Sequence, residues 1–569
     1  MSKLSVSKLL LIIFLVGFLV YLNSLVNGFV WDDEEQILKN PVVQHFSNLG
    51  LVFSSSTFNG GGANPTGWFY RPLMTFSYLV NFSIWGNNPF GFHLFQVLIH
   101  LVNACLVFLF FKELFSREKI AHFKEIGFLA GLIFAIHPGI SEGVVYIAAL
   151  QESLYTFFAL LVFLLLLNLK RFKNQKLWLS LLSFFGLLSF LSKESAVFLL
   201  PLVFLFLLLF LKDKIKLWFL LTLSFFAYLF LRLSVAHIPF SAPNVGPVAE
   251  SPLPVRLMTI PYEIFSYLRI IFYPKYLVIS QHTLINQTSD FRFWGYLILV
   301  LFFISLASFY WWKTRSKLFL FFAFWFFGSL SLLLNILPLD MTVAERWLYF
   351  PLIGFLGMMS FISLEVWKKF AFVKRYGLYF LIFILIIFAI RTIVRNSNWH
   401  DGLTLYGHDI KINGQAFDLE NNYGVELFRI GKVEEAKGHF ERSIFLYHKW
   451  WFAYNNLGAV YERENDLKKA GDLYRKSISY SDYYLAYENL AWIMLKTSPL
   501  PESLKFIQEA VSKFPENSKL IAGLALAYYQ GKNMAEAEKY AQRAVTLEPS
   551  NSNINLLRLI MSKKEIKWN

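Results

Sequence analysis

Acidic residues follow shortly after the first apolar segment, where charge is costly to keep close to a membrane. Residues 29–40 read FVWDDEEQILKN, and the apolar segment before them reads LLLIIFLVGFLVYLNSLV. The simplest interpretation is a solvated loop that ends a helix, because runs of charge usually face water. The alternative is that the loop presents carboxylates at the membrane surface, where one of them can accept a proton from an attacking hydroxyl.

Further polar side chains occur where other apolar segments end. They are Arg71 in GWFYRPL, His93, His100 and Asn103 in FHLFQVLIHLVN, His137 and Glu142 in IHPGISEGV, Lys193 and Glu194 in LSKES, and Glu345 and Arg346 in AERWLYFPLIG. Ionisable residues at membrane depth mark functional sites by default. Structural alternatives stay open for several of them. His100 and Asn103 would bond neighbouring helices. Lys193 and Glu194 would pair with each other, and His137 would only end a helix.

Carboxylates beside membrane-level cations suit one chemistry in particular, the transfer of a sugar from a lipid phosphate. The phosphate of such a donor lies at the interface, where Arg and Lys can neutralise it. A carboxylate can deprotonate an acceptor hydroxyl as its oxygen attacks the anomeric carbon. The cations stabilise the charge that develops on the departing phosphate. The polar clusters converge on one side of the membrane, which favours this interpretation over unrelated helix ends.

The composition requires a membrane domain to position these residues. Of the 569 residues, 56% are hydrophobic and 16% are charged, whereas soluble domains are about a quarter charged. A transmembrane helix needs about 20 mostly apolar residues, and we expect eleven spans with one interfacial or re-entrant helix at 258–273. The spans lie near residues 8–27, 90–111, 125–137, 149–169, 177–192, 195–211, 216–233, 293–312, 318–337, 347–366 and 377–394.

Basic residues orient these spans. With a cytoplasmic N-terminus, lysines and arginines gather in the inner loops, whereas the long outer loop 234–290 has only Arg256, Arg269 and Lys275. This asymmetry is the positive-inside pattern, and it accounts for most of the net charge of +15 without a nucleic-acid partner. An odd number of spans places the acidic loop (residues 29–40) and the C-terminal region on the non-cytoplasmic side.

A helical repeat begins at about residue 416. AYNNLGAVY starts at Ala453 and AYENLAWIM at Ala486, and the triplet at Asn422 recurs thirty-four residues later at Asn456. A period near 34, with small residues where paired helices touch, is typical of tetratricopeptide repeats. About four such units would stack and share a core. The predicted fold is therefore all-α, with a polytopic membrane domain at 1–412 and a tetratricopeptide α-solenoid at 413–569.

The ordered set of motifs resembles the transmembrane and tetratricopeptide-repeat O-mannosyltransferase-like proteins. These belong to the GT-C class, the membrane glycosyltransferases that use polyprenyl-phosphate sugars. The matching stretches are WDD at 31–33, YRPL at 70–73, FHLFQVLIHLVN at 92–103, HPGISEGV at 137–144, SKES at 192–195, ERWLYFPLIG at 345–354 and RTIVRNSNWHD at 391–401. The resemblance covers essentially the whole chain.

The resemblance implies an active site in the first outer loop. It implies that the acid pair Asp32 and Asp33 holds the catalytic base, for which Asp32 is favoured, and that Glu142 is the second acid. Similar proteins often carry an arginine a few residues beyond that glutamate, whereas this chain reads AALQES, with Leu150 and Gln151. Binding of the donor phosphate would then fall to Arg71, Lys193 and Arg346, with His93, His137 and Glu194 in support.

The predicted activity is that of an inverting glycosyltransferase. It would transfer mannose or another hexose from a polyprenyl-phosphate donor to a hydroxyl acceptor, such as Ser or Thr of a protein that the repeats recruit. A transporter is one alternative, but the polar residues cluster at one face rather than at the midplane. A membrane-anchored scaffold is another, but one span would suffice as its anchor. The residues imply no cofactor beyond the lipid-linked sugar and leave a divalent metal open.

The compartment can be read in two ways. The triplets NFS at 81–83 and NQT at 286–288 would be glycosylation sequons in an endoplasmic-reticulum protein. The compact repeats and the absence of a retention signal instead favour a bacterial or archaeal cell membrane, with the repeats on the outer side. We expect the latter and keep the endoplasmic reticulum as the alternative.

Overall fold

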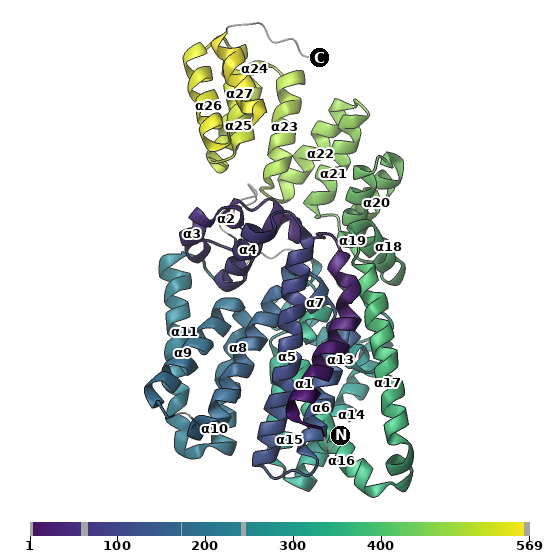
Figure 1. Cartoon of the computed structure of the whole chain (residues 1–569). Helices are drawn as coiled ribbons and strands as arrows, with labels where there is room; N and C mark the ends of the chain where they lie inside the picture. The colour runs from purple at the N-terminus through teal and green to yellow at the C-terminus, as the bar shows by residue number, and fades with distance from the viewer. Residues whose placement is uncertain (1–3, 59–66, 172, 241–245, 563–569) are drawn as a thin grey trace. The chain divides into compact units, whose positions relative to one another are not determined.

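The structure, a computed structural model, describes residues 4–58, 67–171, 173–240 and 246–562. These residues are mainly helical, and no strand occurs among them. They form two compact units with a boundary between Gly414 and Gln415, which we call the membrane unit and the repeat unit (Figure 1).

The helices of the membrane unit are α1 Val6–Tyr21, α2 Pro41–Gln44, α3 Leu49–Ser54, α4 Pro72–Trp85, α5 Pro89–Arg117, α6 Phe123–Ile136, α7 Glu142–Val145, α8 Leu150–Leu167, α9 Gln175–Ser192, α10 Leu199–Phe210, α11 Trp218–Phe230, α12 Pro247–Glu250, α13 Leu253–Phe272, α14 Phe291–Thr314, α15 Lys317–Ser331, α16 Pro351–Lys369, α17 Ala371–Asn398 and α18 Gly402–Ile412. Short 3₁₀ or π turns at Leu22–Val26, Glu34–Leu38, Ile147–Ala149, Glu194–Phe198, Leu231–Val235 and Glu345–Leu348 adjoin several of them.

Each of the eleven predicted spans corresponds to a helix. Eight helical segments of the described chain are long and apolar enough to cross a membrane, namely Val6–Val26, Pro89–Arg117, Ile147–Leu167, Gln175–Ser192, Lys212–Val235, Phe291–Thr314, Pro351–Lys369 and Ala371–Asn398. The other three, α6, Glu194–Phe210 and α15, are shorter. The membrane character is therefore confirmed, while the count of eleven stays a prediction. The expected interfacial helix falls within α13, which contains Pro261.

Glycines allow the central membrane helices to pack closely. A Cβ atom added to Gly131 of α6 would lie 2.8 Å from the backbone oxygen of Ala104 in α5. A Cβ atom on Gly354 of α16 would lie 2.5 Å from the backbone nitrogen of Phe326 in α15. Neither contact tolerates a side chain, so α5 meets α6, and α15 meets α16, with their backbones almost touching. These two pairs support the loops that carry the polar residues.

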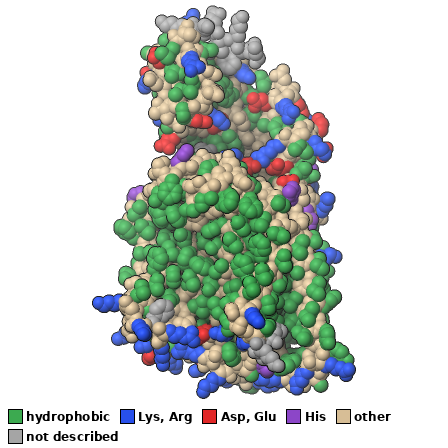
Figure 2. Space-filling view, in the orientation of Figure 1, with side chains coloured by type: hydrophobic (Ala, Val, Ile, Leu, Met, Phe, Trp, Pro, Cys, Tyr) green, Lys and Arg blue, Asp and Glu red, His purple; other side chains and the backbone are tan. Residues whose placement is uncertain are grey.

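The surface of the membrane unit suits a bilayer. Figure 2 shows hydrophobic side chains covering its flank and Lys and Arg gathered at one end. The helices α14 and α17 contribute large exposed side chains to this surface, among them Phe302, Phe309, Phe380 and Phe383. Exposed apolar area on this scale is unusual for a soluble protein. The one-sided placement of the basic residues agrees with the positive-inside pattern.

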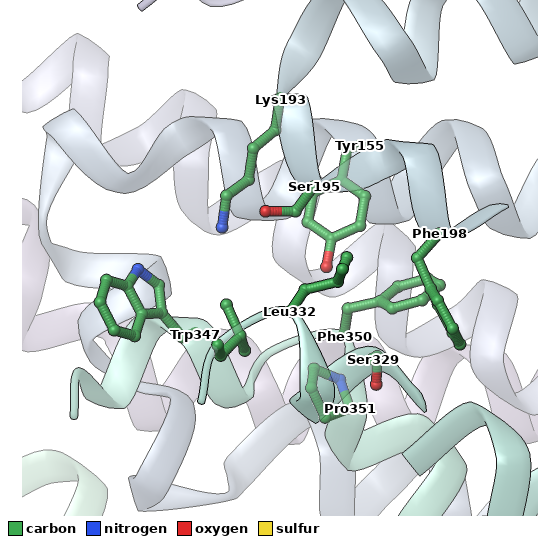
Figure 3. Close-up of a pocket in the computed structure, with 10 residues that line it drawn as sticks. Tyr155, Lys193, Ser195, Phe198, Ser329, Leu332, Trp347, Phe350 and Pro351 are labelled. Carbon is green, nitrogen blue, oxygen red and sulfur yellow. The ribbon is translucent and has the colours of Figure 1, made fainter. Parts of the chain in front are cut away.

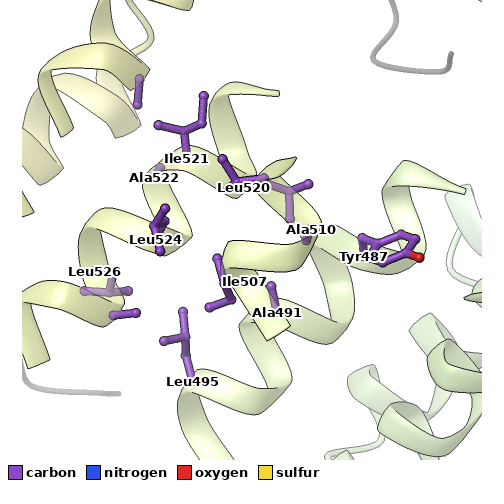
Figure 4. Packing of buried hydrophobic residues seen from close by; sticks show 13 residues of the cluster. Tyr487, Ala491, Leu495, Ile507, Ala510, Leu520, Ile521, Ala522, Leu524 and Leu526 are labelled. Atoms are coloured by element: carbon purple, nitrogen blue, oxygen red, sulfur yellow. The ribbon is translucent and has the colours of Figure 1, made fainter. Parts of the chain in front are cut away.

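The repeat unit consists of helical hairpins, as the 34-residue period predicts. The hairpins are α19 Phe417–Arg429 with α20 Val433–Leu446, α21 Trp451–Arg463 with α22 Leu467–Tyr480, α23 Tyr484–Thr497 with α24 Leu500–Lys513, and α25 Ser518–Gln530 with α26 Met534–Leu547, followed by α27 Asn551–Met561. A Cβ atom at Gly458 of α21 would lie 2.6 Å from Cε1 of Tyr474 in α22. Buried side chains such as Leu495, Ile507 and Leu524 form a core that successive hairpins share (Figure 4). The predicted all-α fold, membrane helices followed by tetratricopeptide repeats, is confirmed.

Candidate functional site

The acidic loop has a defined shape because Asp33 closes it. Asp33 is fully buried; its Oδ2 accepts from the backbone amide of Val30 at 3.0 Å, and its Oδ1 accepts from the backbone amide of Ala148 at 2.8 Å. Trp31, next to the acid pair, adopts a positive φ of 56°, which is uncommon for a bulky side chain. Asp33 therefore fastens the loop to the turn before α8, and its oxygens are already engaged by backbone amides.

Asp32 is placed for proton transfer. It is only partly buried, and its Oδ2 accepts from the Tyr146 hydroxyl at 2.8 Å. Its Oδ1 has no hydrogen-bond donor in the described part of the chain. Burial raises the pKa of Asp32 to about 6, although the Tyr146 bond and the Arg346 charge act in the opposite direction. A carboxylate with a pKa close to neutral is well matched to general-base catalysis.

Glu142 is committed to Arg346. Its Oε1 lies 2.5 Å from Nη1 of Arg346, and its Oε2 accepts from the Arg346 backbone amide at 2.9 Å. Both side chains are buried, and a buried charge needs such a partner. Glu142 therefore orients the turn Glu345–Leu348 and its guanidinium, a geometry that favours a positioning role over proton transfer.

Aromatic rings surround the Arg346 guanidinium beside Asp32. The Arg346 Cζ lies 5.6 Å from the ring centroid of Trp31, 6.0 Å from that of Tyr146 and 5.6 Å from that of Trp347. Arg346 is also within electrostatic range of Asp32. Aromatic faces stabilise a cation held against them. Asp32, the candidate base, and Arg346, a candidate phosphate-binding residue, therefore belong to one cluster.

The LSKES motif forms three ion pairs, and Lys193 and Glu194 do not pair with each other. Lys193 is buried and pairs with Glu152 of α8. Glu194 instead accepts from Nε of Arg71 at 3.0 Å and lies 3.5 Å from Nη1 of Arg232. Arg71 and Arg346 both lie within electrostatic range of the Lys193 ammonium. The structure thus brings together the three cations that the sequence assigned to the donor phosphate.

A small pocket opens next to Lys193. It is lined by Tyr155, Lys193, Ser195, Phe198, Ser329, Leu332, Leu333, Trp347, Phe350 and Pro351. Figure 3 shows Lys193, Ser195 and Tyr155 together on one side, with Trp347, Leu332 and Pro351 on the other. The pocket therefore combines an apolar wall with one ammonium and the hydroxyls of Tyr155, Ser195 and Ser329. Trp347, which also lines it, is the chain neighbour of Arg346.

The histidines of the candidate set bond mainly to backbone groups. His93 Nε2 lies 3.4 Å from the Gly28 oxygen, and His137 uses Nδ1 to accept from the Gly139 amide and Nε2 to donate to the Ile271 oxygen. His100 and Asn103 bond to the Tyr349 hydroxyl and to backbone oxygens of neighbouring helices. The interhelical and helix-end interpretations describe these contacts well.

A second buried cluster lies behind Arg346. Arg395 Nη1 donates to Oδ1 of Asp409 at 2.8 Å, and its Nη2 lies 3.5 Å from Oε1 of Glu345. All three side chains have no exposed area. Burial raises the pKa of Glu345 to about 8 against the opposing charge of Arg395. Through the contact between Arg395 and Glu345, the cluster fixes the turn Glu345–Leu348.

Sequence reasoning missed several residues of this site. Tyr146, Glu152, Arg232, Arg395 and Asp409 were not among the candidates. A signal existed for two of them, since Glu152 lies in the quoted AALQES stretch and Arg395 in RTIVRNSNWHD. Within the described ranges, no group of three or more His, Cys, Asp or Glu side chains is arranged to hold a metal ion.

Comparison with known proteins agrees with the motif set. Residues 71–234 match the family of dolichyl-phosphate-mannose-protein mannosyltransferases, and residues 453–483 and 519–551 match tetratricopeptide repeats. The protein O-mannosyl-transferase TMTC3 of Homo sapiens is 24% identical over 97% of this chain and 66% of its own length. The chain resembles the protein O-mannosyl-transferases.

Other relatives extend this similarity. The protein O-mannosyl-transferase F38B6.6 of Caenorhabditis elegans is 25% identical over 77% of this chain and 62% of its own length. The chain thus spans no more than about two thirds of these relatives. Among solved structures, the tetratricopeptide protein YrrB matches 28% of this chain and 82% of its own at 16% identity, with a TM-score of 0.25. The relatives named here come from animals, so they give no support to the expected bacterial or archaeal membrane.

Proposed function

We propose that this multi-pass membrane protein is an inverting glycosyltransferase. It transfers mannose, or a closely related hexose, from a polyprenyl-phosphate donor to a Ser or Thr hydroxyl of a protein at the non-cytoplasmic face. The observation that carries the proposal is the Oδ1 oxygen of Asp32, which accepts no hydrogen bond in the described part of the chain. Asp32 lies within electrostatic range of Arg346, and three further cations, Arg71, Lys193 and Arg232, belong to the same site. The mannosyltransferase family match and the names of the relatives support the choice of sugar.

The proposed reaction is a single displacement. Asp32 takes the proton of the acceptor hydroxyl while the acceptor oxygen forms a bond to the anomeric carbon. The bond between that carbon and the phosphate oxygen breaks, and its electron pair leaves with the polyprenyl phosphate. Because attack and departure occur on opposite faces of the sugar, the configuration at the anomeric carbon inverts.

The charge balance of the site supports phosphate as the leaving group. Four cations, Arg71, Lys193, Arg232 and Arg346, face the three carboxylates Glu142, Glu152 and Glu194. The ionised Asp32 is a fourth carboxylate beside Arg346, so the charges balance until Asp32 takes the acceptor proton, and one positive charge is then left over. The departing phosphate gains one negative charge as the ester breaks, and preorganised cations stabilise such developing charge. The pocket beside Lys193 places apolar side chains next to these cations.

The animal relatives favour the endoplasmic-reticulum membrane, and in this proposal the repeats lie on its luminal side. There the repeats recruit the acceptor, since tetratricopeptide arrays present extended surfaces for peptides and proteins. In this arrangement the acceptor is held by one unit while the other unit binds the lipid donor.

The full-length protein in proteoliposomes tests the proposal directly. Each labelled polyprenyl-phosphate hexose is supplied with a Ser- and Thr-containing acceptor, and release of polyprenyl phosphate is measured together with label on the acceptor. We expect the mannosyl donor to be consumed and the product to carry inverted linkages. Failure to consume any lipid-phosphate hexose, with donor binding intact, would show the proposed activity to be wrong.

A further inference from the structure

The segment 391–401, which contains the end of α17, is hydrogen-bonded to the residues just before the acidic loop. The Gly28 amide donates to the backbone oxygen of His400 at 2.9 Å. Asn27 Nδ2 donates to the backbone oxygen of Asn396 at 3.1 Å. These bonds tie the residues just before the acidic loop to the last membrane helix, a segment more than three hundred and fifty positions away in sequence.

Trp399 of this segment reaches the candidate base through one tyrosine. Its indole is fully buried and stacks on the ring of Tyr146, with centroids 5.3 Å apart and planes 29° apart. Trp31 also stacks with Tyr146, at 5.5 Å and 15°. The Tyr146 hydroxyl donates to Asp32. The tyrosine ring is thus fixed by two tryptophans, one from the acidic loop and one from the end of α17.

The buried ion pair of Arg395 and Asp409 fixes the Trp399 indole. Arg395 Cζ lies 5.7 Å from the Trp399 ring centroid, and Arg395 is itself fixed by Asp409 of α18. Stacked aromatic rings resist rotation because they lose contact on both faces when they turn. The order of contacts therefore runs from Asp409 through Arg395 and Trp399 to Tyr146, and ends at the carboxylate of Asp32.

We propose that Trp399 is a positioning residue for the transfer, which keeps the Tyr146 hydroxyl on Asp32 by fixing the tyrosine ring. Trp399 touches neither sugar nor phosphate in this proposal, which rests on the proposed function for its effect on rate. Its effect on Asp32 itself is independent of that function. A bond to the ionised form of an acid favours ionisation, so a loosened Tyr146 leaves Asp32 protonated up to a higher pH.

Other titratable and charged groups also act on Asp32, and we expect them to stay in place when Trp399 is changed. They are Asp33 and Glu35 on the acidic loop, Tyr78 of α4, Arg346 of the turn Glu345–Leu348, and Asp340 of the loop before it. In the described part of the chain, none of these groups forms a ring contact or a hydrogen bond with Trp399, whose ring contacts are with Tyr146 and Arg395. A change in the titration of Asp32 in a Trp399 variant is therefore attributable to Tyr146.

The experiment uses the full chain in proteoliposomes with labelled polyprenyl-phosphate mannose, and rates are measured from pH 5 to 8. For Trp399→Leu we expect kcat to fall about tenfold with the donor KM unchanged, because only the base is affected. The acid limb of the pH profile should move upward by about half a pH unit or more. Tyr146→Phe should shift the limb in the same direction, and the double variant should add little, since the two residues act through one contact.

Two further variants make the result specific. Trp399→Phe keeps an aromatic face on Tyr146, so it should shift the acid limb of the pH profile less than Trp399→Leu does. It also replaces Trp399→Leu in the experiment if that variant does not fold. Trp178→Leu removes an equally buried indole, whose Nε1 donates to the Leu165 oxygen. It should lower the amount of folded protein without moving the acid limb.

Titration of the carboxyl group separates failure of this proposal from failure of the proposed function. The infrared carboxyl band of Asp32, identified by its absence in Asp32→Asn, is followed against pH. A higher midpoint in Trp399→Leu supports the positioning role even if no sugar is transferred. An unchanged midpoint, or a rate loss equal at every pH as in Trp178→Leu, overturns it.

Discussion

Asp32→Asn separates proton transfer from the structure of the acidic loop. Asparagine has nearly the size of aspartate, and its side-chain oxygen can still accept from the Tyr146 hydroxyl, which lies 2.8 Å from Asp32 Oδ2. It cannot take the proton of an attacking hydroxyl. Loss of a general base lowers rates by a factor of about 10² to 10⁴, equivalent to ~3 to 5 kcal/mol of transition-state stabilisation. The wild-type rate should also fall about tenfold per pH unit below pH ~6, because burial raises the pKa of Asp32 to about 6.

The same substitution should leave the fold intact. The pKa of Asp32 is raised by burial from 3.8 to about 6, so the folded state binds this proton more tightly than the unfolded chain does. Asp32 therefore destabilises the fold as the pH rises from about 4 to about 6, and a neutral side chain removes that effect. The thermal midpoint of Asp32→Asn at pH 7 should equal or exceed that of the wild type.

Neighbouring acids provide matched controls. Asp33→Asn keeps only one acceptor oxygen for two backbone amides, and a buried unsatisfied donor costs about 1–3 kcal/mol, so the yield of folded protein should fall. Glu35→Gln loses an exposed pair with Lys39, which contributes no more than about 1 kcal/mol, and its turnover should be unchanged. The assay is release of polyprenyl phosphate per folded enzyme, with donor binding measured separately. Near-normal turnover of Asp32→Asn would refute the reasoning.

Three other predictions address donor binding, orientation and the repeats. Arg71→Gln should raise the donor KM by about 10- to 100-fold, because a charge-assisted contact contributes about 1.5–3 kcal/mol. Glu194 should stay in place, since it keeps its ion pair with Arg232. An equal rise in KM in Arg292→Gln, an exposed control, would argue against a phosphate site at Arg71. A reporter fused at the C-terminus should be active only on the non-cytoplasmic side and one fused after Gln175 only on the cytoplasmic side, so activity on one shared side would disprove the predicted number of spans. Truncation after Ile412 should leave a membrane domain that binds donor but glycosylates a protein acceptor poorly, and full turnover of that acceptor would rule out recruitment by the repeats.

The sequence by itself determined the features that depend on local physics. Apolar runs of about 20 residues specify membrane helices wherever they occur, and the 34-residue period specifies stacked hairpins. Gly424 and Gly458, read as repeat markers, lie where a ring of the partner helix leaves no room for a Cβ atom. The sequence also offered Arg71, Lys193 and Arg346 as candidate cations, and their role at a donor phosphate stays a prediction.

Only the tertiary structure decided which charged side chains form ion pairs with each other. Lys193 pairs with Glu152 rather than with its neighbour Glu194, and Glu142 pairs with Arg346 across 204 residues of sequence. The Tyr146 hydroxyl that bonds Asp32 is 114 residues away from it. Adjacent side chains at a helix end point in different directions, so nearness in sequence does not predict contact. Burial then requires every charge to find a partner in space, and that partner depends on how the helices pack.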